Sequence, residues 1–135
     1  MPMKKILVVD DEPSIRKPVK LTLTKAGYEV VEAQDGEQAI KVLNSDDNPL
    51  MVDTILCDIQ MPTINGIDAI AYFRTQYPTV PVVVMTGYPD VDLAVRLMKQ
   101  GVRDYLVKPV SKEKLLTVIS ESVDNHVILD GQFAA

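Results

Sequence analysis

Short, mostly apolar runs alternate along the chain with longer stretches in which apolar residues recur at helical spacing. The runs cover residues 6–9, 28–33, 50–57, 80–85 and 104–107, and each has the length of a strand; residues 6–9 and 55–57 show the unbroken apolar composition of a strand buried on both faces. Helical spacing follows each run, over residues 13–26, 37–43, 67–77, 91–101 and 111–123. Five β-α units in strict alternation predict an α/β fold, (βα)5, in which helices cover both faces of a doubly wound, parallel five-stranded sheet.

Particular residues mark the ends of these helices. Gly27 and Gly101 follow the first and fourth helices, where a glycine commonly closes the last turn. Ser111 precedes the last helix and suits its N-cap. Pro18 falls inside the first helix and removes a backbone donor there, so we expect it to kink that helix or to shift its start.

Length and charge limit the class of protein. The 135 residues make one domain of ordinary size, which we place at 1–124, followed by a C-terminal tail or linker stub, 125–135, that lacks clear periodicity. A content of 47% hydrophobic and 24% charged residues is typical of a globular protein. The net charge of -5, without a basic face, argues against direct contact with nucleic acid.

The single cysteine and the N-terminal sequence indicate the compartment. Cys57 has no partner for an intramolecular disulfide and lies within an apolar run, as an inert buried thiol would. Only four apolar residues, 6–9, follow the start of the chain, too few for a signal-peptide core or a membrane span. We therefore expect a cytoplasmic protein that does not bind membranes.

Polar residues of a particular kind stand at the ends of the predicted strands. Asp10 and Asp11 follow the first strand, Asp58 the third, Thr86 the fourth and Lys108 the fifth. Right-handed crossovers put all these strand ends at one edge of the sheet. Three carboxylates gathered there repel one another unless a cation neutralises them, and Mg²⁺ suits such oxygen ligands. A lysine and a hydroxyl beside them can hold phosphoryl oxygens, so the set suits phosphoryl transfer onto a carboxylate.

From Lys4 to about Asp124 the chain resembles the receiver domain of two-component response regulators, a flavodoxin-like fold. The matching residues are the pair Asp10-Asp11, then Asp58-Ile59-Gln60-Met61-Pro62 with Gly66, then Thr86-Gly87, and finally Tyr105 ahead of Lys108-Pro109. Each of these motifs is common alone, and their occurrence in order at successive strand ends is highly specific.

The resemblance implies a phosphoacceptor. Asp58 would take a phosphoryl group from the phosphohistidine of a sensor histidine kinase or a histidine phosphotransfer protein. Asp11 and Asp58 would bind Mg²⁺ directly, with the backbone carbonyl of Gln60 as a third protein ligand and Asp10 acting mainly through water. The domain would catalyse only its own phosphorylation and dephosphorylation, as a signalling switch and not an enzyme with a separate substrate.

It also implies a switch. Lys108 would pair with a phosphoryl oxygen from a cis Lys108-Pro109 peptide, the backbones of Gln60 and Gly87 would bind the phosphoryl group, and Thr86 would move to hydrogen-bond it. Tyr105 would then change rotamer. The face formed by the fourth helix, fifth strand and fifth helix would alter its affinity for a target protein, an output domain or a second copy in a homodimer.

Other functions are less well matched by the residues. A phosphatase of the haloacid dehalogenase type typically needs a second acid two residues after its nucleophile, where this chain has Gln60. The P-loop motif of nucleotide triphosphatases is absent from the sequence. A receiver-like module that binds partners without phosphorylation usually lacks one of the key residues, and none of them is missing from this sequence. The sequence leaves open the cognate kinase, the regulated process, and whether an output domain belongs to the full protein.

Overall fold

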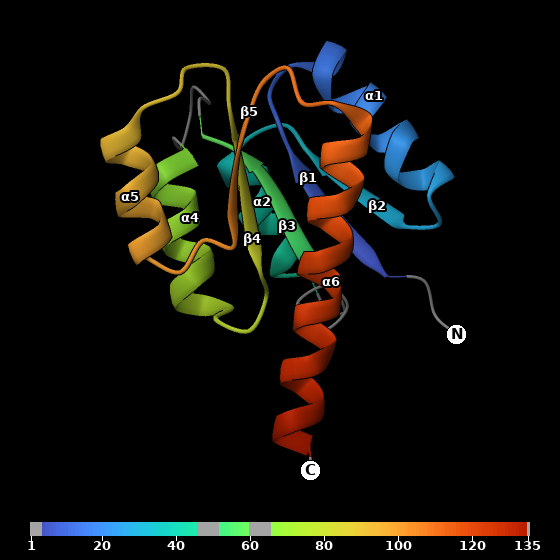
Figure 1. The fold of residues 1–135 in the computed structure, drawn as a ribbon, viewed down its shortest axis with the longest axis vertical. Coiled ribbons are helices and arrows are strands. Elements are labelled where there is room, and N and C mark those ends of the chain that lie inside the picture. Colours follow the sequence, from blue (N-terminus) through green and yellow to red (C-terminus); the bar gives the residue numbers. More distant parts are fainter. Residues whose placement is uncertain (1–3, 46–51, 60–65, 135) are drawn as a thin grey trace.

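A single parallel sheet forms the centre of the molecule (Figure 1). The computed structural model describes residues 4–45, 52–59 and 66–134, with the side chains of 125–134 excepted. The strands are β1 (Lys5–Val9), β2 (Glu29–Ala33), β3 (Val52–Asp58), β4 (Val82–Thr86) and β5 (Asp104–Val107). All neighbouring pairs are parallel, in the order β2-β1-β3-β4-β5. This is the flavodoxin-like order, and the predicted fold class is confirmed.

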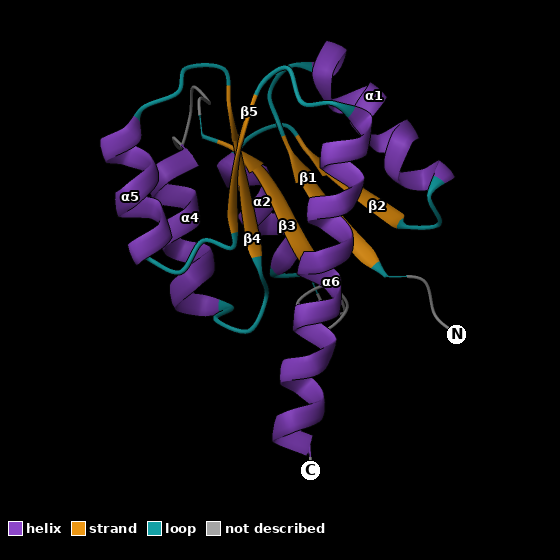
Figure 2. Cartoon of the chain, in the orientation of Figure 1, coloured by secondary structure: helices purple, strands orange, loops and turns teal. Residues whose placement is uncertain are grey.

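Helices cover both faces of this sheet (Figure 2). They are α1 (Pro13–Lys25), α2 (Gly36–Leu43), α4 (Gly66–Gln76), α5 (Val91–Lys99) and α6 (Lys112–Ala134). One core lies on the face covered by α1 and α6, and a second core lies on the face covered by α2, α4 and α5. The fourth and fifth helices predicted from the sequence are α5 and α6.

The run of residues 6–9 in the central strand β1 is entirely apolar because it contributes to both cores. In β1, Leu7 and Val9 belong to the core beneath α2, α4 and α5, while Ile6 and Val8 belong to the core beneath α1 and α6. All four side chains are fully buried. The first acid after these four residues is Asp10, which stands where β1 ends, at the edge of the sheet.

The structure tests the residues predicted to bound or to disturb the helices. Gly27 and Gly101 adopt positive φ angles of 99° and 95°, which glycine adopts without strain. The Ser111 hydroxyl accepts a hydrogen bond from the Lys114 N–H at 3.1 Å. Pro18 lies inside α1 with its side chain exposed, and the helix still begins at Pro13, so the possible shift of its start is not observed.

The last helix is longer than its apolar spacing indicates. Periodicity predicted an end near Val123, whereas α6 continues to Ala134 and projects past the amino-terminal edge of the sheet (Figure 1). Apolar spacing reports burial against the sheet, and a helix needs no apolar stripe beyond that edge. No proline follows Pro109 to interrupt it. Among the described residues, no helix is both long and apolar enough to cross a membrane.

Candidate functional site

Parallel pairing brings the strand ends together at one edge. Val9 in β1 is the register partner of Cys57 in β3, so the next residues along these strands, Asp10 and Asp58, lie side by side. Both carboxylates are almost completely buried, with exposed fractions of 0% and 1%. Thr86 is equally buried at the end of β4. The structure therefore confirms the predicted convergence of these residues.

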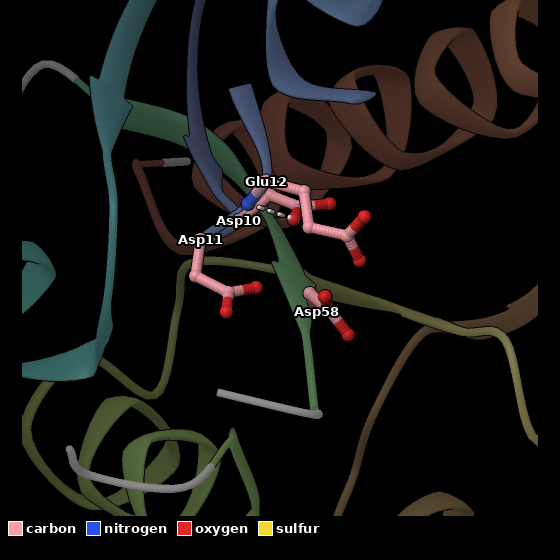
Figure 3. Close-up of side chains that lie close together, drawn as sticks. All are labelled: Asp10, Asp11, Glu12 and Asp58. Atoms are coloured by element: carbon pink, nitrogen blue, oxygen red, sulfur yellow. Dashed lines mark hydrogen bonds between the residues drawn. The ribbon is translucent and has the colours of Figure 1, made fainter. Parts of the chain in front are cut away.

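Four acidic side chains form a cluster at this edge, which we call the acidic cluster: Asp10, Asp11, Glu12 and Asp58 (Figure 3). Each contributes a carboxylate oxygen, and these oxygens lie within 4.8 Å of one another. The sequence had singled out the three aspartates but not Glu12. The run of three consecutive acids after β1 was the available signal for the fourth member.

Lys108 supplies a positive charge to the acidic cluster. Its Nζ donates to Asp58 Oδ2 at 2.9 Å and to Asp10 Oδ2 at 3.1 Å. Burial by itself would lower the pKa of the Lys108 ammonium, but the hydrogen bond to Asp58 and the charges of Asp10 and Asp58 outweigh it, and the pKa is raised. The Lys108-Pro109 peptide bond is cis, as expected from the resemblance.

The two neighbouring aspartates differ in how their oxygens are satisfied. Asp10 Oδ1 accepts from the Glu12 N–H at 3.0 Å, and its Oδ2 accepts from Lys108. Asp11 Oδ1 is buried and has no hydrogen-bond partner among the described residues. A buried carboxylate oxygen without a partner is costly. Asp11 therefore has an oxygen available for a cation, whereas both oxygens of Asp10 are engaged.

The donor set fits a hard divalent cation. The four carboxylates of the acidic cluster lie close together, and the Lys108 ammonium group pairs with two of them, the buried Asp10 and Asp58, which leaves an excess of negative charge at this edge. Mg²⁺ prefers oxygen ligands and binds through one or two carboxylates while it keeps several waters. The unpartnered oxygen of Asp11 lies in the cluster that also holds Asp58.

Thr86 and Tyr105 make contacts on the side of the site that faces α5. The Thr86 hydroxyl accepts from the Tyr88 N–H at 3.0 Å and donates to the Tyr88 carbonyl at 3.3 Å. The Tyr105 hydroxyl accepts from the N–H of Asp90, the N-cap of α5, at 3.2 Å. Both residues thus hold the loop that joins β4 to α5.

Three further predicted positions remain. Gly87 lies beside Lys108 in the lining of a cavity of about 540 Å³ between α1 and the start of α6. Gln60, predicted as a backbone ligand, lies outside the described residues. Cys57 is buried, and burial, together with the charges of Asp58 and Asp10, raises the pKa of its thiol, so the prediction of a buried thiol is confirmed.

Comparison with known proteins agrees with this geometry. The family model of the response regulator receiver domain matches residues 6–120. Among curated proteins, the chain is 38% identical over 118 residues to the transcriptional regulatory protein ZraR of Klebsiella oxytoca and 34% identical over 121 residues to the DNA-binding transcriptional regulator NtrC of Proteus hauseri. These matches cover 87% and 90% of this chain but 26% and 25% of the relatives, so the chain spans about a quarter of their length.

Solved structures agree in fold as well as in sequence. A response regulator receiver domain protein from Clostridium thermocellum superposes with a TM-score of 0.87 at 31% identity, over 94% of this chain and 99% of that one. The chemotaxis protein CheY4 of Vibrio cholerae gives 0.81 at 32% identity, over 90% and 99%. The sheet order, the acidic edge and these matches together show that the chain belongs to the response regulator receiver domain family.

Proposed function

We propose that the domain accepts a phosphoryl group on Asp58 in a Mg²⁺-dependent reaction and thereby switches a binding face. The observation that carries the proposal is the 2.9 Å contact between Asp58 Oδ2 and Lys108 Nζ at the edge of the acidic cluster. A carboxylate is the nucleophile there, and a fixed ammonium group lies where a transferred phosphoryl oxygen needs a positive charge. The donor is a sensor histidine kinase or a histidine phosphotransfer protein, met in the cytoplasm.

The transfer is a displacement at phosphorus. A carboxylate oxygen of Asp58 forms a bond to phosphorus, the bond from phosphorus to the imidazole nitrogen of the phosphohistidine breaks, and the electron pair of that bond stays on the imidazole. Asp11 and Asp58 would hold Mg²⁺, together with the Gln60 carbonyl, and Asp10 would act through water because both its oxygens are engaged. When bound, Mg²⁺ supplies positive charge to the phosphoryl oxygens.

Lys108 changes partner in this reaction. The carboxylate of Asp58 becomes part of the acyl phosphate, so the Lys108 ammonium group leaves Asp58 Oδ2 and pairs with a phosphoryl oxygen. It can keep its contact with Asp10 Oδ2. Its backbone N–H donates to the Thr86 carbonyl at 2.8 Å, which fixes the ends of β4 and β5 against each other. The lysine is thus held directly after the end of β5, the strand that carries Tyr105.

Thr86 connects the phosphoryl group to the binding face. Its hydroxyl now contacts Tyr88, and a dianion on Asp58 offers a stronger acceptor within the same buried edge. Moving the hydroxyl inward releases the loop before α5 and the Tyr105 hydroxyl that is bonded to Asp90. The face of α5, β5 and α6 then changes its affinity.

The surface of this face suits contact with a protein. Val91, Val95 and Met98 of α5 and Val107 of β5 are exposed apolar side chains, and α5 and Tyr105 line a cavity of about 490 Å³. A target protein, an output domain or a second copy would cover them. We place the domain at 1–124. Because the matched region makes up only about a quarter of the curated relatives, we also propose that the end of α6, from residue 125, leads towards an output module.

Magnesium dependence tests the proposed chemistry. We expect intact-mass spectrometry to show the gain of one phosphoryl group when the protein is incubated with acetyl phosphate and Mg²⁺, and no gain when the cation is removed with a chelator. The reason is that the excess negative charge of the acidic cluster repels the phosphodonor unless a cation offsets it. Equal gain with and without Mg²⁺ would remove the metal from the mechanism, and no gain under either condition would favour a module that binds partners without phosphorylation.

Thr86→Ala tests the switch separately from the chemistry. The variant should still gain a phosphoryl group in the presence of Mg²⁺, because the nucleophile and Lys108 are unchanged. In spectra of ¹⁵N-labelled protein, the Asp90 and Tyr105 amide signals should shift on phosphorylation of the wild type and stay close to their unphosphorylated positions in the variant. Equal shifts in both proteins would show that the face responds without Thr86.

A further inference from the structure

Arg16 joins three elements behind the acidic cluster. It lies in the first half of α1, and its Nη1 donates to the backbone carbonyl of Asp10 at 2.7 Å. Its Nε donates to Glu32 Oε1, on β2, at 3.1 Å. The side chains of Arg16 and Glu32 are only 12% and 17% exposed. One guanidinium group therefore ties the end of β1 to β2 and α1.

The carbonyl that Arg16 contacts belongs to the peptide that joins Asp10 to Asp11. The N–H of Asp10 is bonded to the Ala33 carbonyl at 3.0 Å, so its two backbone polar groups are held from β2 and from α1. Fixing the plane of this peptide fixes the direction in which the chain enters Asp11. Asp11 has no comparable restraint at its Oδ1, which is buried without a partner among the described residues.

We propose that Arg16 is a positioning residue for the metal ligands: by holding the Asp10–Asp11 peptide, it directs the Asp11 carboxylate into the acidic cluster, where the carboxylate can bind Mg²⁺. The inference rests on the proposed function, because that function requires the cation. In this role Arg16 acts through the backbone carbonyl of Asp10 and not through a side chain of the acidic cluster. Its planar guanidinium group can serve two acceptors at fixed angles, which a lysine ammonium group cannot do in the same way.

Glu32 anchors the guanidinium group. Besides Arg16 it pairs with Lys17 and Lys20, at 2.9 Å and 3.2 Å. Burial alone would raise the pKa of Glu32, but the hydrogen bonds from Lys17, Lys20 and Arg16 outweigh it and lower the pKa to about 2. Glu32 is therefore a carboxylate at neutral pH, and it stays paired with the two lysines when Arg16 is replaced.

Arg16→Gln and Lys17→Gln form a matched pair of variants. Each removes one positive charge from α1 and one partner from Glu32, but only Arg16 contacts the Asp10 carbonyl. Lys17 is 59% exposed. By charge alone, either change should slightly strengthen the binding of a cation to the acidic cluster. Loss of positioning should instead weaken the binding of the cation, and only in Arg16→Gln. The effect of charge and the effect of positioning on cation affinity therefore have opposite signs.

The test is calorimetric titration of each protein with Mg²⁺, without a phosphodonor and at constant ionic strength. We expect Arg16→Gln to bind Mg²⁺ roughly tenfold more weakly, the loss typical when a group that orients a metal ligand is removed. Lys17→Gln should bind at least as tightly as the wild type. Arg16→Lys keeps the positive charge but lacks the planar guanidinium group, so it should also bind Mg²⁺ more weakly. If Arg16→Gln does not fold, Arg16→Lys decides the question alone.

The outcomes separate the inference from the proposed function. Wild-type affinity in both Arg16 variants, or an equal loss in Lys17→Gln, would overturn the positioning role while the metal site stands. Absence of Mg²⁺ binding to the wild type would overturn the metal site and the positioning role together. In the supporting case, the Asp11 amide signal of the metal-free protein also shifts in Arg16→Gln and not in Lys17→Gln, because only the former frees the adjacent carbonyl.

Discussion

Asp58→Asn is expected to abolish phosphoryl uptake and to leave the domain at least as stable as the wild type. An asparagine amide has nearly the shape of the aspartate and keeps one oxygen that can accept from Lys108. It carries no charge and is not a nucleophile for an acyl phosphate. Removing one of four clustered negative charges also relieves their repulsion, and Asp10 remains as a partner of Lys108.

The measurement is intact-mass spectrometry after incubation with acetyl phosphate and Mg²⁺, together with thermal unfolding of the same samples. Asp35→Asn is the matched control, because Asp35 caps α2 through its side chain and an asparagine caps equally well. The control should gain a phosphoryl group at the wild-type rate. Gain of a phosphoryl group by Asp58→Asn at that rate would show that another residue is the acceptor.

The fold and the edge residues were predictable because they depend on local patterns. In β1 the residues that contribute to the two cores form an unbroken apolar run, so the acids that follow it, Asp10 and Asp11, mark where the strand ends. Once the strand ends are known, parallel pairing and right-handed crossovers bring them together without further information. The predicted convergence of Asp10, Asp58, Thr86 and Lys108 followed from those two steps alone.

The contacts of Arg16 were not predictable in that way. Glu32 is a polar residue within a predicted strand. Which residues it can contact depends on the strand register, which sets it beside Val8 in β1. Arg16 lies on a helix whose rotation relative to β2 is a property of tertiary packing. Neither residue carries a local signal of a shared role. The end of α6 was missed for a different reason, since a helix that extends beyond the sheet need not show regular apolar spacing.

Lys108 connects the stability of the domain with its chemistry. The carboxylates of Asp10 and Asp58 are buried side by side, and both lie within hydrogen-bond distance of the Lys108 ammonium group. Pairing offsets much of the cost of burying charges, so the same contact that prepares a phosphoryl site also allows two acids to be buried together. A domain built in this way should lose stability and reactivity together when that positive charge is removed.

Lys108→Met should therefore lower the free energy of unfolding by about 3 kcal/mol in the absence of divalent cations, the cost typical of leaving a buried charge without its partner. Methionine keeps the length and apolar stem of lysine, which confines the change to the charge. The rate of phosphorylation by acetyl phosphate should fall by roughly a hundredfold or more, as when a fixed electrostatic group is removed from a transition state.

Magnesium distinguishes this explanation from a simple packing defect. Because Mg²⁺ can supply the missing positive charge to Asp58 and its neighbours, it should stabilise Lys108→Met more than it stabilises the wild type in urea unfolding. Lys41→Met is the control, since Lys41 is 74% exposed and pairs only with Glu37 among the described residues, at 3.4 Å. Lys41→Met should change neither the free energy of unfolding nor the rate of phosphorylation. If Lys108→Met were as stable as the wild type without Mg²⁺, the two buried carboxylates would have to be compensated by some other group, and the account of Lys108 as their counter-charge would be wrong.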